Sequence, residues 1–203
     1  MNRRYLALTT LLLASGITSL PEARANDLII PAPELTVIED ESTLTHVNVR
    51  AGASSSSESG RPVICMQVSA IAELSFETCG TGTGFLHNDP TPEMAHFRMK
   101  WATNRWSIAQ GLIELQAGLG FTELQVGNDT PGFSFGVPTT TEPIETAGPE
   151  ASLSLQWIYP LDLGLELVGD ATFGAAWLKY APQLVTPRDK LAPFGEISAG
   201  VGW

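Results

Sequence analysis

Apolar and polar residues alternate along much of this chain with the period of two that a β-strand imposes on its side chains. Between Ala95 and Trp101, every second residue is apolar or aromatic, and the residues between them are basic. One face of such a strand is therefore apolar and the other charged. Comparable alternation occurs in residues 43–52, 63–71, 73–78, 113–122, 151–157, 163–177 and 195–203. The pattern predicts an all-β protein with eight strands.

The segment 63–78 allows two interpretations. Its even-numbered residues from Ile64 to Phe76 are apolar, which fits one long strand, and residues 71–73 lack the Gly, Pro, Asn or Asp typical of a turn. A hairpin centred on Ala72, however, places Cys65 opposite Cys79 and brings the strand count to eight. We predict the hairpin and keep the single long strand as the alternative.

Long and short connections alternate between the predicted strands. The long loops are residues 53–60, 80–93, 127–149 and 179–190, and the short turns are expected near residues 71–73, 103–105 and 160–162. This arrangement is typical of transmembrane barrels, which have long outer loops and short periplasmic turns.

The last segment of the chain carries the most specific pattern. Ile197, Ala199, Val201 and Trp203 form its apolar face, and Trp203 is the final residue. The segment resembles the closing strand of bacterial outer-membrane β-barrels, in which a terminal aromatic residue, usually Phe, is part of the assembly signal. The resemblance is to small barrels as a general class. It implies a transmembrane antiparallel up-and-down β-barrel in the cell outer membrane of a Gram-negative bacterium, with outer-membrane lipid and the barrel assembly machinery as partners.

The tryptophans support a membrane location. All of them fall near predicted strand ends, where an amphipathic indole ring is favoured at a membrane–water interface. They are Trp101, Trp106, Trp157, Trp177 and Trp203. In a soluble β-barrel or sandwich, which is the alternative fold, we would expect some of them in the middle of strands.

The N-terminus has the form of a secretory signal peptide. Arg3 and Arg4 precede a short apolar run, and Ala23-Arg24-Ala25 provides a cleavage site. The run is too short for a membrane helix, which needs about 20 residues. We therefore expect a signal peptide at residues 1–25, a flexible periplasmic lead-in at 26–42 and the barrel at 43–203. A signal anchor is the alternative.

Charge and cysteine content narrow the partners further. The chain has 11 Lys and Arg against 22 Asp and Glu, and this acidity makes nucleic acid an unsuitable partner. In an oxidising compartment the two cysteines, Cys65 and Cys79, are expected to form a disulfide, with a free pair as the alternative. They make a poor zinc site, and we expect no metal and no cofactor.

Several charged residues alternate with the apolar ones and should face the lumen of the barrel. They are His46, Arg50, Arg98, Lys100, Glu114, Glu166, Asp170 and Glu196. Isolated charges in a narrow lumen are costly, so we expect ion pairs. Strand order suggests that Glu114 lies beside the basic residues of the preceding strand. Arg50 and Glu196 should lie at one depth where the first and last strands meet. We interpret the set as a structural network that fills the lumen, and a gate or ion path is the alternative.

A search for catalytic residues is limited by the three histidines, His46, His87 and His96. None is followed by Ser two residues later, which is the pair found in outer-membrane lipid A deacylases. His87 and Asp89 are more typical of a turn than of a base with its orienting carboxylate. The glycine-rich residues 80–84 lack the Lys of a phosphate-binding loop.

We therefore expect a non-enzymatic structural or interaction component of the cell envelope. Its outer loops, at residues 53–60, 80–93 and 127–149, would be contact surfaces, including for other envelope proteins. The alternatives are a lipid-directed outer-membrane hydrolase or acyltransferase and, third, a narrow pore.

Overall fold

The computed structural model describes residues 47–57, 60–71, 73–82, 91–126, 145–185 and 189–203. The expected signal peptide, the lead-in, His46 and His87 lie outside these residues. Eight strands are present, together with a short 3-10 helix η1 (Asp162–Gly164) and a short helix α2 (Ala181–Leu184). The strands are β1 (Val47–Ser54), β2 (Val63–Ile71), β3 (Leu74–Gly80), β4 (Glu93–Ile108), β5 (Gly111–Gln125), β6 (Glu145–Pro160), β7 (Glu166–Trp177) and β8 (Leu191–Gly202). Within the described part of the chain, no helix is long and apolar enough to cross a membrane.

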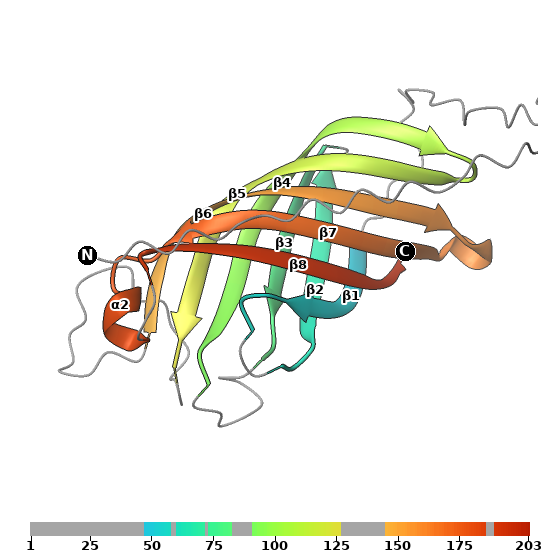
Figure 1. Ribbon diagram of the computed structural model, residues 1–203. Coiled ribbons are helices and arrows are strands. Elements are labelled where there is room, and N and C mark those ends of the chain that lie inside the picture. The colour runs from blue at the N-terminus through green and yellow to red at the C-terminus, as the bar shows by residue number, and fades with distance from the viewer. Residues whose placement is uncertain (1–46, 58–59, 72, 83–90, 127–144, 186–188) are drawn as a thin grey trace, which may run out of the picture. The chain divides into compact units, whose positions relative to one another are not determined.

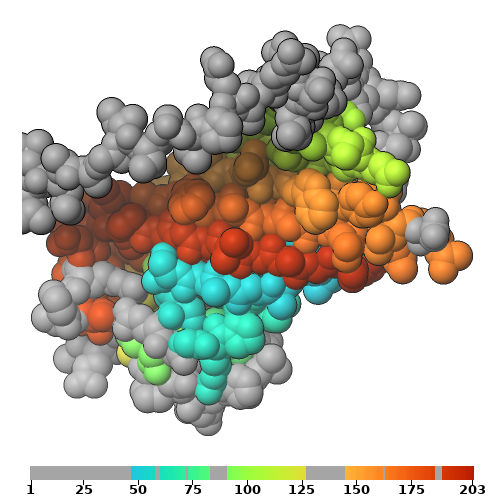
Figure 2. Space-filling model, turned by 45° about the vertical axis from the view of Figure 1, so that its right-hand side comes forward, coloured from blue at the N-terminus to red at the C-terminus, as the bar shows by residue number. Residues whose placement is uncertain are grey.

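The strands form a closed antiparallel barrel in which each one pairs with its neighbours in sequence (Figure 1). The predicted eight-stranded up-and-down barrel is confirmed. Closure is made by β1 and β8, which lie side by side in Figure 2 as cyan and red surfaces. The backbone N–H of Val47 donates to the carbonyl of Trp203 at 3.1 Å, and the N–H of Trp203 donates back at 3.0 Å.

The two ends of the barrel differ. We call the end with the short connections β2–β3, β4–β5 and β6–β7 the turn end, and the opposite end the loop end. β1 starts and β8 finishes at the turn end.

The pleat of the strands separates an apolar exterior from a polar interior. Large side chains such as Leu119, Phe173 and Ile197 are 64%, 68% and 67% exposed, whereas Arg50 and Lys100 are buried. The predicted alternation is thus observed in three dimensions, with the charged face turned inwards. This distribution is the reverse of that in most soluble proteins, where charged residues stay exposed.

The β2–β3 hairpin and its disulfide are confirmed, and the single long strand is wrong. Cys65 lies directly opposite Cys79 in the register, and the two form a disulfide with a Cα–Cα distance of 4.1 Å. The hairpin turns without Gly or Pro. A register irregularity between Ser69 and Ile71 adjusts the strand just before the turn.

The turn predicted at residues 103–105 is wrong. β4 continues to Ile108, and the chain reverses at Ala109, which has a positive φ of 54°. A bulge between Ala102 and Asn104 shifts the register by one residue. Because the side-chain period is two, this shift exchanges the faces of all later residues of β4. Trp106, which simple alternation would turn inwards, instead lies on the outward side opposite Ile113.

The starts of two other strands, β6 and β7, differ from the predicted ones. Residues 145–149, expected in a loop, belong to β6, and the rest of that loop, residues 127–144, lies outside the described residues. β7 begins at Glu166 rather than at residue 163, because η1 occupies the turn. Leu163 adopts a left-handed conformation there, with φ 70°, and is 96% exposed.

Four of the tryptophans lie near strand ends, whereas Trp101 is in the middle of β4. Trp101 pairs with Leu74, the first residue after the β2–β3 turn, and Trp157 lies three residues before the end of β6. Trp177 ends β7 at the loop end. Trp101, Trp177 and Trp203 are all more than half exposed, with values of 53%, 51% and 53%. These three rings therefore lie on the outer surface, with Trp177 and Trp203 at strand ends and Trp101 beside the β2–β3 turn.

Candidate functional site

The lumen contains the densest group of charged side chains in the described structure, and we treat it as the candidate site. An eight-stranded barrel has room inside for side chains but not for an open channel. Its contents here fall into successive layers. Each layer is built from inward-facing residues of several strands.

An apolar cluster occupies the loop end. Residues from β4, β5, β7, β8 and the segment after β7 meet there, and they are Met94, Leu124, Ala176, Leu178, Ala181, Ala192 and Phe194. The segment is held by the backbone N–H of Leu178, which donates to the carbonyl of Lys190 at 2.7 Å. Leu178 and Ala181 are fully buried. This cluster fills the loop end of the lumen with apolar side chains.

Glu77 is the hub of the next layer, the central network. Its carboxylate forms ion pairs with Arg50, with Arg98 at 3.3 Å and with Lys100 at 2.8 Å. Asp170 is the second carboxylate of this group, at 3.0 Å from Arg50 and 3.3 Å from Lys100. All five side chains are buried, so each charge is compensated by neighbours rather than by water.

Arg98 links Glu77 to the residues nearer the loop end. Its guanidinium lies 2.9 Å from Glu150 and 2.8 Å from Glu196. The ring of Phe194 lies beneath the same group, with its centroid 5.2 Å from the guanidinium carbon. His96 lies between the two carboxylates, with Nδ1 2.7 Å from Glu150 and Nε2 3.6 Å from Glu196.

Glutamine side chains form the layer below, towards the turn end. Gln156 donates to Gln67 at 2.7 Å, Gln116 donates to Gln156 at 3.2 Å, and Gln67 donates to Ser75 at 2.8 Å. Arg50 also donates to Gln67 at 3.2 Å, which connects this layer to the central network. The amides can both donate and accept, so they extend the polar packing without adding charge.

The predicted pairing of Arg50 with Glu196 is wrong. Arg50 lies opposite Gly200 on β8, whereas Glu196 lies opposite Ser54. The prediction counted depth from residue 43, but the backbone pair that ends the β1–β8 ladder is Val47 with Trp203. The true pairing of β1 with β8 is therefore four residues away from the predicted one. As a result, Glu196 contacts Arg98 and His96, whereas Arg50 contacts Glu77 and Asp170.

The expected position of Glu114 beside His96, Arg98 and Lys100 is wrong as well. Lys100 lies opposite Gly118, and Glu114 lies opposite Arg105, to which it forms an ion pair at 2.8 Å. The bulge in β4 produces this contact, because it turns the side chain of Arg105 to the face of Glu114. Glu166, the remaining predicted lumen residue, lies at the first position of β7 and is half-buried at the turn end.

Sequence analysis missed Glu77 and Glu150, two carboxylates of this site. Glu77 has the same odd-numbered parity as Cys79, so alternation in a hairpin would have turned it inwards. Glu150 was not among the predicted lumen residues, because it lies between the expected loop, which ended at Pro149, and the expected strand, which began at residue 151. The observed β6 starts at Glu145, six residues before the predicted start at residue 151.

Glycines lie opposite the three basic side chains of the central network. Arg50 pairs with Gly200, Arg98 with Gly120 and Lys100 with Gly118. A Cβ atom added at Gly120 would lie 2.0 Å from the carbonyl oxygen of Phe97, and one at Gly200 would lie 2.0 Å from that of Val49. The strands therefore approach closely beside the basic residues, and only a residue without a side chain fits there.

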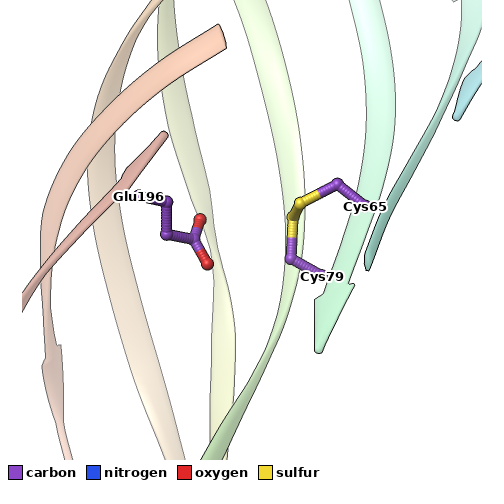
Figure 3. A group of neighbouring side chains, drawn as sticks. All are labelled: Cys65, Cys79 and Glu196. Atoms are coloured by element: carbon purple, nitrogen blue, oxygen red, sulfur yellow. A yellow bond between two sulfur atoms is a disulfide. The ribbon is translucent and has the colours of Figure 1, made fainter. Parts of the chain in front are cut away.

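The disulfide also faces the lumen, close to Glu196 (Figure 3). Ligand atoms of Cys65, Cys79 and Glu196 lie within 4.8 Å of one another, a spacing compatible with a metal ion. Both sulfur atoms are, however, joined in the disulfide. A thiolate is the form of cysteine that binds metal, so the oxidised pair does not supply ligands.

At the loop side of the central network, His96 is connected to a serine. Ser56 Oγ lies 3.3 Å from His96 Nε2, and Glu150 lies at the other ring nitrogen. Thr122 donates to the same carboxylate oxygen of Glu150. Ser56 follows the end of β1, so three separated parts of the chain meet here.

Comparisons of the chain with protein-family models, with curated proteins and with solved structures give no match.

Proposed function

We propose that this protein is an outer-membrane β-barrel whose lumen is filled by its own side chains. It acts as a structural or interaction component of the cell envelope, through its loop end and outer surface rather than through a pore. The observation that carries this proposal is the inverted polarity of the barrel, with an apolar exterior around an ion-paired interior. Outer-membrane lipid and the barrel assembly machinery are its proposed partners, and other envelope proteins would bind the outer loops.

The exterior supports a lipid environment. The exposed apolar residues come from all parts of the barrel wall, and such a surface in water would favour aggregation. A hollow of about 420 Å³ on the outer face of β2–β5 is lined by apolar residues that include Met66, Phe76, Phe97 and Leu119. In a membrane, lipid acyl chains would cover this surface. Every strand is paired on both sides, so the closed ladder meets the requirement that backbone polar groups be satisfied in lipid.

The interior argues against the pore. The apolar cluster, the central network and the glutamine layer follow one another along the lumen, and most of their side chains are buried. An ion passing through would have to separate ion pairs that water does not solvate. The charged residues are therefore better explained as the filling of the lumen.

Membrane insertion is expected to be visible on gels and in cell fractions. Unboiled protein in detergent should migrate differently from boiled protein, because the closed hydrogen-bonded barrel resists SDS. The protein should also be found in the outer-membrane fraction. Deletion of Trp203 should reduce the assembled fraction, since this residue pairs with Val47 at the closing seam. Recovery of folded protein in the soluble periplasmic fraction would contradict the proposal.

Conductance separates a filled barrel from a pore. The purified protein in planar lipid bilayers is expected to give no steady channel openings under conditions in which an open porin conducts. The reason is the layered filling of the lumen. Stable single-channel steps that disappear with boiled protein would favour the pore instead.

A further inference from the structure

We infer that Ser56, His96 and Glu150 form a nucleophile, base and acid arrangement with esterase-type acyl-transfer activity at the loop end of the lumen. The order of contacts is the one this chemistry requires. The serine hydroxyl contacts one nitrogen of the imidazole at 3.3 Å, and the carboxylate contacts the other at 2.7 Å. The inference does not depend on membrane insertion, since all three residues belong to the folded barrel.

The hydrogen bond from His96 Nδ1 to Glu150 determines the role of each imidazole nitrogen. A carboxylate only accepts, so Nδ1 of His96 carries the proton and Nε2 is left to accept from the hydroxyl of Ser56. The carboxylate itself is held by Arg98 at 2.9 Å and by the hydroxyl of Thr122. Glu150 is thus fixed in a position that orients the ring.

The surroundings favour the charge that proton transfer creates. When Ser56 gives its proton to Nε2, His96 becomes an imidazolium between Glu150 and Glu196, whose oxygen lies 3.6 Å from Nε2. The central network and the two carboxylates next to it, Glu150 and Glu196, together contain three basic side chains against four carboxylates. One further positive charge on His96 would balance this group.

The serine is held in place by its own loop. The backbone N–H of Ser56 donates to the hydroxyl of Ser54 at 3.2 Å, and the two hydroxyl oxygens lie 2.6 Å apart. Ser56 is 3% exposed and His96 is 0% exposed. The adjacent serine, Ser55, is instead exposed and contacts the backbone N–H of Gly195.

The neighbouring residues indicate the substrate class. The ring of Phe194 lies 4.3 Å from that of His96, and Met94 and Leu124 belong to the same apolar cluster. These side chains form an apolar wall beside the base. Ser56 and His96 are both buried, so only a small ester can approach them, and we assign the substrate class as a carboxylic ester with a short acyl chain.

The reaction follows from these positions. Ser56 Oγ attacks the ester carbonyl while its proton moves to His96 Nε2. The alcohol then leaves with that proton, and the acyl group remains on Ser56. Water next attacks the acyl-serine, passing a proton to Nε2. The carboxylic acid leaves as Ser56 regains its proton, so that ester and water give acid and alcohol.

The test is labelling of the folded barrel with a small alkyne-bearing fluorophosphonate, which serine nucleophiles attack with loss of fluoride. We expect the adduct on the peptide that contains Ser56. Labelling should be lost in Ser56→Ala and should fall at least tenfold in Glu150→Gln. Ser55→Ala is the matched control and should label like the unaltered protein. Release of p-nitrophenol from p-nitrophenyl acetate should follow the same order.

Each variant is compared only as folded protein, judged by the gel shift between unboiled and boiled samples. Absence of labelling in the folded, unaltered protein would overturn the inference. So would an adduct on another residue or one that persists in Ser56→Ala. These outcomes leave the proposed membrane role untouched, because that role is tested by fractionation and conductance.

Discussion

Replacement of Glu77 by Gln is expected to destabilise the barrel more than any other single change of charge in the lumen. The variant keeps the size of the side chain but removes the negative charge shared by Arg50, Arg98 and Lys100. Breaking a buried ion pair by removing one partner typically costs about 3–5 kcal/mol. We expect a loss of this size in the free energy of unfolding, measured by urea titration in detergent.

The control for this variant is Glu73→Gln. Glu73 lies in the same hairpin, at its turn, and is exposed. Exposed charges contribute little, so the free energy of unfolding should change by less than about 1 kcal/mol. Equal losses in the two variants would show that the central network does not stabilise the fold.

A second change tests whether the loss comes from the uncompensated cations. The double variant Glu77→Gln with Lys100→Met removes one of them together with the carboxylate. Residues in one ion-pair network are not expected to behave additively. The double variant should therefore be less destabilised than the sum of the two single variants.

Replacement of Gly120 by Ala is expected to be nearly as severe, for a steric reason. The added Cβ would lie 2.0 Å from the carbonyl oxygen of Phe97 and 2.7 Å from the Cα of Arg98. Both atoms belong to the backbone of β4, so the strand itself would have to move. Overpacking of this kind costs on the order of 1–3 kcal/mol, and a backbone clash places the variant at the upper end.

The measurement is the fraction of protein that shows the gel shift of the closed barrel, together with urea unfolding. Gly169→Ala is the matched control. Its Cβ would meet the ring of Trp157 at 3.7 Å, an ordinary contact. If both variants assemble and unfold alike, the close approach of β4 and β5 at Gly120 is not required for the fold.

Much of the barrel wall follows from local sequence pattern. The period of two places Arg98, Lys100 and Asp170 on the inner face and aromatic and aliphatic residues on the outer face. The symmetry of Cys65 and Cys79 about Ala72 predicts the hairpin and the disulfide, and both are present. These features depend only on neighbouring residues and on the pleat of a strand, so the sequence is sufficient to predict them.

The partners of the charged residues depend on the register between strands. Alternation shows which side chains face the lumen but not how far along it they lie. The register of β1 against β8 places Glu196 where it forms an ion pair with Arg98. The bulge in β4 places Arg105 where it forms an ion pair with Glu114.

The contact of Ser56 with His96 likewise joins residues 40 positions apart, and that of His96 with Glu150 joins residues 54 apart. The sequence alone determined the number of strands, the alternating faces outside the β4 bulge and the cysteine pair, because these are local properties of the chain. The tertiary structure decided which charges and hydroxyls meet in the lumen, because closure of the barrel sets the relative depth of all eight strands at once.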